Sequence, residues 1–120
     1  MRIRSSARRT FLAVSLASGL VLSFAGAASA REVVRATDNL FRPARVAVSV
    51  GERVVWRNTG NNPHTVTAYG RNWRKDSLIS PGERTARTFN APGRYRYLCT
   101  IHGDIVDRQC VGMCGRVTVG

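Results

Sequence analysis

After residue 30 the sequence consists of short runs in which apolar and polar residues alternate, with no helical period among them. A period of two places the apolar side chains of a strand on one face, where they can pack on a core. Glycine and proline separate the runs, as at Gly51, Pro81-Gly82 and Pro92-Gly93, and such residues are typical of turns. The clearest runs are 46–50, 54–56, 85–89, 95–99 and 117–119. The pattern predicts an all-β sandwich, and 120 residues are too few for more than one ordinary domain.

Residues 68–80 are the least regular part of this pattern. They contain Trp73, and a lone tryptophan in a long connection usually packs against the core. The other large aromatic residues fall on the alternating runs or beside them, and we interpret them as core. They are Phe41, Trp56, Tyr95 and Tyr97.

The first 30 residues differ from the rest. Four arginines open the chain, an apolar run follows at 11–25, and Ala28-Ser29-Ala30 ends the segment with small residues. This is the pattern of a secretory signal peptide. We therefore expect a signal peptide at 1–30, a mature domain at 31–120, and export to the periplasm or the outside of the cell. The alternative is an uncleaved anchor, but the apolar run is short for a span of about 20 residues.

The route of export stays open. Arg8-Arg9, followed by Thr10 and Phe11, is similar to a twin-arginine signal. That route carries folded proteins and would suit a chain that takes up its cofactor before export. An arginine pair can also arise by chance in a chain this rich in arginine.

The predicted mature domain is small and basic. The signal segment holds 4 of the 19 basic residues and none of the 7 acidic ones, which leaves a net charge of +8. A surface of this kind attracts acidic proteins or an anionic membrane, and export argues against nucleic acid. The alternative is that the arginines only keep the domain soluble. A domain of about 90 residues often needs a metal or a disulfide for stability.

Four residues of scarce types suggest a metal site. Cys99 and His102 are three positions apart after an alternating run, Met113 precedes the last run, and His64 follows Pro63 in a predicted turn. Two histidines, one cysteine and a weak axial methionine are the ligand set of blue copper. Singly, each residue would more often be a core or turn residue, so the inference depends on the combination.

The sequence resembles the cupredoxin (blue copper) family over nearly the whole predicted domain. The segments that carry the resemblance are 38–43, 54–58, Pro63-His64-Thr65-Val66, 95–102 and 112–119. The resemblance implies a Greek-key β-sandwich that binds one copper ion. His64, Cys99, His102 and Met113 then take the four ligand positions, and His102 is the exposed edge through which electrons pass.

One departure from the family concerns the axial ligand. Ten residues separate His102 from Met113, where the relatives have only a handful, and the additional stretch is roughly 105–111. Gln109 lies in that stretch and is an alternative axial ligand, because glutamine can replace methionine in such sites. The spacing from Met113 to the last strand fits the family and favours Met113.

Cys110 lies in this additional stretch, and Cys114 follows four positions later. In an exported chain they are candidates for a disulfide bond. The alternatives are two unpaired thiols, or a zinc site shared with Cys99 and His102 that would leave His64 unexplained. Asn58 is a candidate to hydrogen-bond across the two ligand segments. The alternative is that it merely ends its strand.

The sequence favours a monomeric electron carrier that meets acidic redox partners. The alternative is a copper-handling protein for storage, delivery or resistance, but the tracts rich in Met or His that typify such proteins are absent. An enzyme is not expected. Multicopper oxidases and nitrite reductases need additional histidines, and no Ser/His/Asp set or carboxylate pair suggests hydrolysis.

Overall fold

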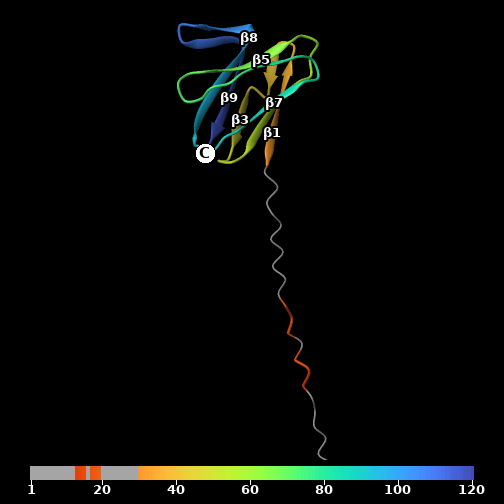
Figure 1. Cartoon of the computed structure of the whole chain (residues 1–120). Coiled ribbons are helices and arrows are strands. Elements are labelled where there is room, and N and C mark those ends of the chain that lie inside the picture. Colours follow the sequence, from red (N-terminus) through yellow and green to blue (C-terminus); the bar gives the residue numbers. More distant parts are fainter. Residues whose placement is uncertain (1–12, 16, 20–29) are drawn as a thin grey trace, which may run out of the picture.

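The computed structural model describes residues 13–15, 17–19 and 30–120 (Figure 1). The predicted signal peptide, with its Arg8-Arg9 pair, lies largely outside the described residues and stays a prediction. Among the described residues, no helix is long and apolar enough to cross a membrane.

Residues 30–120 form two β-sheets that face each other (Figure 1). The first sheet has the order β2 (Leu40–Arg42), β1 (Arg31–Thr37), β4 (Arg53–Asn58) and β7 (Arg84–Thr88). The second has the order β3 (Arg45–Val48), β9 (Gln109–Val119), β8 (Gly93–Val106), β5 (His64–Tyr69) and β6 (Asp76–Ile79). The predicted all-β sandwich is confirmed.

The alternating residues fill the space between the sheets. Burial alternates along β1 and β3, for example at Val34 and Ala36 in β1, whereas β4, β5 and β8 each bury three consecutive residues. The run predicted at 46–50 is shorter than expected, because β3 ends at Val48 and the following residues turn.

Trp73 anchors its connection to the core, as the sequence predicts. Its ring centroid lies 5.5 Å from that of Phe89 and 5.9 Å from that of Tyr95. The indole nitrogen donates a hydrogen bond to the carbonyl oxygen of Arg96 at 2.9 Å. Residues 68–80 are more regular than the sequence suggests, because β6 lies within them and pairs with β5.

The additional stretch at roughly 105–111, which the cupredoxin relatives lack, continues strands β8 and β9. β8 and β9 pair from Gly103–Gly112 to Val106–Gln109 and form a hairpin. Asp107 and Arg108 at its end have φ angles of 50° and 65°. Positive φ at both central residues is the mark of a type I′ turn, which matches the twist of a two-residue hairpin.

The base of this hairpin is sharply bent. Cys110 and Cys114 are joined by a disulfide, and their Cα atoms are 6.0 Å apart. Four residues of straight strand would span about 13 Å, so β9 turns back on itself between the two cysteines. Gly112 lies in the bend with φ of 90°, where a Cβ atom would be 2.5 Å from the carbonyl oxygen of His102. Ile105 and Arg108 of the hairpin line a groove together with Arg96 and Arg116, so the hairpin folds toward the outer face of the five-stranded sheet.

Tyr97 lies in the centre of the sandwich and is fully buried. Its ring lies directly over Gly115, the residue paired with it on β9, so that any side chain at 115 would overlap the ring. The hydroxyl group has no hydrogen-bond partner among the described residues. Burial raises the pKa of Tyr97 to about 12.

The raised pKa gives a prediction for alkaline solution. An unfolded tyrosine ionises near pH 10 whereas the buried one does not, so the contribution of Tyr97 to stability is complete below pH 10 and lost as pH rises toward 12. The Tyr97→Phe variant should unfold with the same or higher free energy at pH 7. It should exceed the wild type by roughly a further 2–3 kcal/mol at pH 12. Denaturant unfolding at both pH values measures this, and a constant difference would contradict the prediction.

The disulfide gives a second prediction. Cys99 is the free cysteine of the described residues. Thiol titration of copper-free protein, unfolded without a reductant, should therefore find one thiol per chain, and none in the Cys99→Ser variant. Three thiols in the wild type would show that Cys110 and Cys114 are not bonded.

Candidate metal centre

A register shift between β8 and β9 creates the site. The two strands pair regularly up to Leu98–Cys114 and again from Gly103–Gly112. Between these pairs β8 has four residues, Cys99 to His102, while β9 has only Met113. The excess residues of β8 must bulge out of the sheet. The bulge brings the Cys99 and His102 side chains to the same end of the sandwich.

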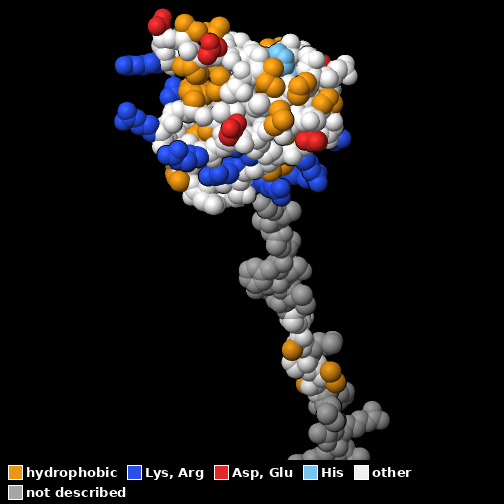
Figure 2. Space-filling model, turned by 45° about the horizontal axis from the view of Figure 1, so that its top comes forward, with side chains coloured by type: hydrophobic (Ala, Val, Ile, Leu, Met, Phe, Trp, Pro, Cys, Tyr) orange, Lys and Arg blue, Asp and Glu red, His pale blue; other side chains and the backbone are white. Residues whose placement is uncertain are grey.

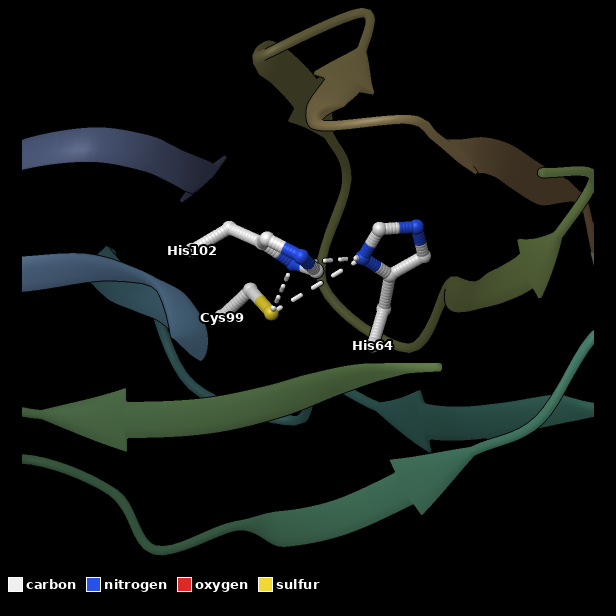
Figure 3. A group of neighbouring side chains, drawn as sticks. All are labelled: His64, Cys99 and His102. Atoms are coloured by element: carbon white, nitrogen blue, oxygen red, sulfur yellow. Dashed lines mark hydrogen bonds between the residues drawn. The ribbon is translucent and has the colours of Figure 1, made fainter. Parts of the chain in front are cut away.

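His64 reaches this place from a different part of the chain. It is the first residue of β5, the strand that pairs with β8 at Thr67–Leu98, and it is fully buried. Its Nδ1 lies 3.2 Å from Nδ1 of His102 and 3.8 Å from Sγ of Cys99. Sγ of Cys99 is 3.6 Å from Nδ1 of His102. Figure 3 shows the three side chains pointing toward one another.

These separations fit a single metal ion. With metal–nitrogen bonds of about 2.0 Å and a metal–sulfur bond of about 2.3 Å, ligands in a trigonal plane are about 3.5 Å (N–N) and 3.7 Å (N–S) apart. Thiolate together with imidazole suits copper or zinc. The three donor atoms therefore lie close to the positions that one such ion requires.

Asp38 orients His64, and the sequence analysis missed this residue. Its Oδ1 accepts a hydrogen bond from Nε2 of His64 at 3.0 Å. An ionised carboxylate can only accept, so Nε2 carries the hydrogen and Nδ1 keeps its lone pair for a metal. Only the parallel pairing of β1 with β4 brings Asp38 beside the turn before His64, so no local sequence signal could have revealed it.

The carboxylate of Asp38 is itself fixed. The backbone amides of Asn61 and Asn62 donate to its two oxygens at 2.8 and 3.1 Å. These bonds, with that from His64, hold the pKa of Asp38 below its ordinary value. The charged form is therefore the one that the turn and the histidine select.

Two threonines join the ligand segments. The backbone amide of Thr65 donates to Sγ of Cys99 at 3.3 Å. The backbone amide of Thr100 donates to Oγ1 of Thr65 at 2.8 Å, and the two hydroxyl groups are 3.1 Å apart. The His64 segment and the Cys99 segment are thus held together directly, by residues that the sequence analysis did not single out.

Asn58 does not hydrogen-bond across the two ligand segments; its side chain binds the turn before His64 and β6 instead. Its amide nitrogen donates to the carbonyl oxygens of Asn62 at 2.7 Å and Ile79 at 2.9 Å, and its Oδ1 accepts from the amide of Gly60 at 2.9 Å. The side chain is buried. Asn58 therefore ties the turn before His64 to β6.

Met113 lies opposite the bulge and is fully buried. A Cβ atom at Gly103 would be 2.9 Å from the carbonyl oxygen of Met113 and 3.0 Å from that of Cys99, so both backbones meet at this glycine. Gln109, the alternative axial ligand, is exposed at the hairpin turn, four residues along β9 from Met113. Cys110 and Cys114 share a disulfide and so have no thiolates to offer zinc.

Comparison with known proteins places this arrangement in a family. The family model described as "Cupredoxin-like domain" matches residues 10–108. The chloroplastic plastocyanin of Tetradesmus obliquus is 31% identical over 88% of this chain and 80% of its own length. Amicyanin-alpha of Methylorubrum extorquens is 30% identical over 73% of this chain and 77% of its own.

Solved structures agree on the fold. Amicyanin from Paracoccus versutus superposes with a TM-score of 0.62 and 26% identity, covering 80% of this chain and 87% of that one. A purple cupredoxin from Nitrosopumilus maritimus gives a TM-score of 0.59 at 22% identity, covering 73% and 98%. With its two sheets, its copper-compatible donor set and these similarities, the chain belongs to the cupredoxin family and is a copper-binding protein.

Proposed function

We propose that the protein is an exported one-electron carrier whose single copper ion is held by His64, Cys99, His102 and Met113. The observation that carries the proposal is the convergence of three donor atoms, within 4.8 Å of one another, at a bulge that the sheet pairing fixes. Copper bound there supplies a Cu(I)/Cu(II) couple that gains or loses one electron.

The residues around the site suit this function because they hold the ligands still. His64 and Cys99 are fully buried; the imidazole is fixed by the hydrogen bond that it donates to Asp38, and the sulfur by the one that it accepts from the Thr65 amide. The Thr65 amide also stabilises the negative charge on the thiolate. Donor atoms that are already in place need little rearrangement when the charge of the site changes.

The exit for electrons is His102, which is partly exposed whereas His64 is buried. Ile101 beside it is half exposed. In Figure 2 the exposed histidine surface lies among hydrophobic side chains, while Lys and Arg side chains gather along other borders of the domain. An apolar contact around the histidine would exclude water and let a partner approach closely.

Copper storage or delivery is the second candidate, and the site favours it less. A protein that passes copper on needs ligands that a partner can reach. Here two of the three clustered donors are buried and hydrogen-bonded. For the whole protein we propose a cleaved signal peptide at 1–30, a domain at 31–120, a periplasmic or extracellular location, a monomeric state, transient acidic partners and no catalytic activity of its own.

The ligand set predicts a strong colour. The copper-loaded protein should absorb intensely toward the red end of the visible spectrum, from charge transfer between the Cys99 thiolate and copper. Cys99→Ser should abolish this band. The double variant Cys110→Ser/Cys114→Ser, which removes two sulfurs outside the site, should keep it. A band that survives Cys99→Ser would refute the assignment of the thiolate.

Asp38 gives a prediction for the reduction potential. Removing its negative charge should destabilise the oxidised site relative to the reduced one and raise the reduction potential, on the order of 50 mV for Asp38→Asn. Glu52→Gln is a matched control, because it also removes one negative charge. Glu52 directly precedes Arg53, at the end of β4 that is farther from the turn before His64. Voltammetry measures both variants. An unchanged or lowered potential for Asp38→Asn would contradict the role of this carboxylate.

A further inference from the structure

A row of arginines crosses the outer face of the five-stranded sheet. Tyr69 of β5 pairs with Arg96 of β8, Arg96 pairs with Arg116 of β9, and Arg116 pairs with Arg45 of β3. Like charges directly opposite one another on neighbouring strands destabilise a sheet. A row of this kind therefore favours the binding of an anion that compensates the repulsion.

The bent hairpin forms a wall beside this row. Ile105 and Arg108 of the hairpin line a groove of about 900 Å³ together with Arg94, Arg96 and Arg116 of the sheet. An adjoining groove of about 550 Å³ runs between the disulfide and Arg45. No carboxylate of the described residues lines either groove. Both cysteines of the disulfide line this adjoining groove, so the bend lies directly beside the arginine row.

The guanidinium groups in this place lack partners within the described part of the chain. Among the described residues the ion pair found is that of His64 with Asp38, and it involves no arginine. Nε of Arg116 is buried without a hydrogen-bond partner. The guanidinium of Arg96 is held over the ring of Tyr69, 5.0 Å from its centroid. Arg94, Arg96 and Arg108 are exposed, so the groove offers accessible guanidinium donors, for which carboxylates are the natural match.

The opposite sheet provides a comparison. Its outer face also carries an aligned row, which runs through Arg42, Arg35, Arg57 and Arg84. All four of these residues are exposed, as are Arg45 and Arg96 of the first row, whereas Arg116 is partly buried. Arg35 and Arg42 of this second row line a groove of about 710 Å³ of their own, but no residue of the hairpin borders it. Positive charge is therefore common to both faces, whereas the wall and the buried unpartnered nitrogen belong to the first.

We propose that the larger groove, here called the arginine groove and lined by Arg94, Arg96, Arg108 and Arg116, docks a cluster of carboxylates on the acidic surface of the redox partner. The proposal rests on the proposed carrier function and names the partner's chemistry. Arg96 is three residues before Cys99 on β8, about 10 Å along the strand. A partner held in the groove would therefore lie close to the copper ligands, while its apolar contacts could form around His102.

The test compares two pairs of substitutions that remove the same charge. Arg96→Gln/Arg108→Gln neutralises the groove, and Arg35→Gln/Arg57→Gln neutralises the exposed row of the other sheet. Each copper-loaded protein is reduced and then oxidised by an acidic c-type cytochrome in a stopped-flow instrument. One electron passes from Cu(I) to the ferric haem, which becomes ferrous. The series runs from low to high ionic strength.

At about 10 mM salt, where the Debye length is about 30 Å, the groove variant should react about tenfold more slowly than the wild type. The control variant should change less than about twofold, and all three rates should converge at 1 M salt. Equal slowing of both variants would show that only total charge matters and would overturn the proposal. Unchanged rates would overturn it as well.

Two further measurements distinguish partner docking from a loss of electron transfer and from membrane binding. Voltammetry at an electrode should give the same reversible one-electron wave for all three proteins. If the wild type gave none, the carrier function itself would fail, and the groove with it. Sedimentation with phosphatidylserine vesicles should not depend on the groove. Loss of vesicle binding in the groove variant, with unchanged cytochrome rates, would make the groove a membrane site and overturn the proposal.

Discussion

The register shift between β8 and β9 is the constraint on which the site depends. Regular pairing on both sides of the shift leaves Cys99 to His102 opposite Met113 alone. The sheet thus determines where the thiolate and one imidazole lie. β5 pairs with β8 next to the bulge and brings His64, so one neighbouring strand completes the donor set. The metal geometry is a consequence of strand pairing.

Hydrogen bonds then convert this arrangement into fixed ligands. Asp38 selects the tautomer of His64, and Thr65 binds the sulfur of Cys99 while its hydroxyl accepts from Thr100. Beyond the site, the same two strands continue into the bent hairpin. One strand pair thus supplies Cys99, His102 and Met113 as well as the hairpin that borders the arginine groove, so the proposed docking place lies next to the copper site along the same two strands.

The sequence could predict what depends on local pattern. Alternation indicated the strands, and the scarce residue types with their spacing indicated His64, Cys99, His102 and Met113 as one group. Asp38 and the Thr65–Thr100 contact could not be predicted, because they join segments that are 26 and 35 residues apart. The additional stretch at 105–111 was recognised, but its form was not. A type I′ turn with two non-glycine residues and a bend at Gly112 give little signal in sequence.

One copper ion should lie between His64, Cys99 and His102. A crystal structure of the copper-loaded protein, with anomalous diffraction measured on both sides of the copper edge, tests this most directly. We expect one strong anomalous peak at bonding distance from Nδ1 of His64, Sγ of Cys99 and Nδ1 of His102, with the sulfur of Met113 as a longer fourth contact. A peak that is held through Nε2 of His64, or that lies away from Cys99, would contradict it.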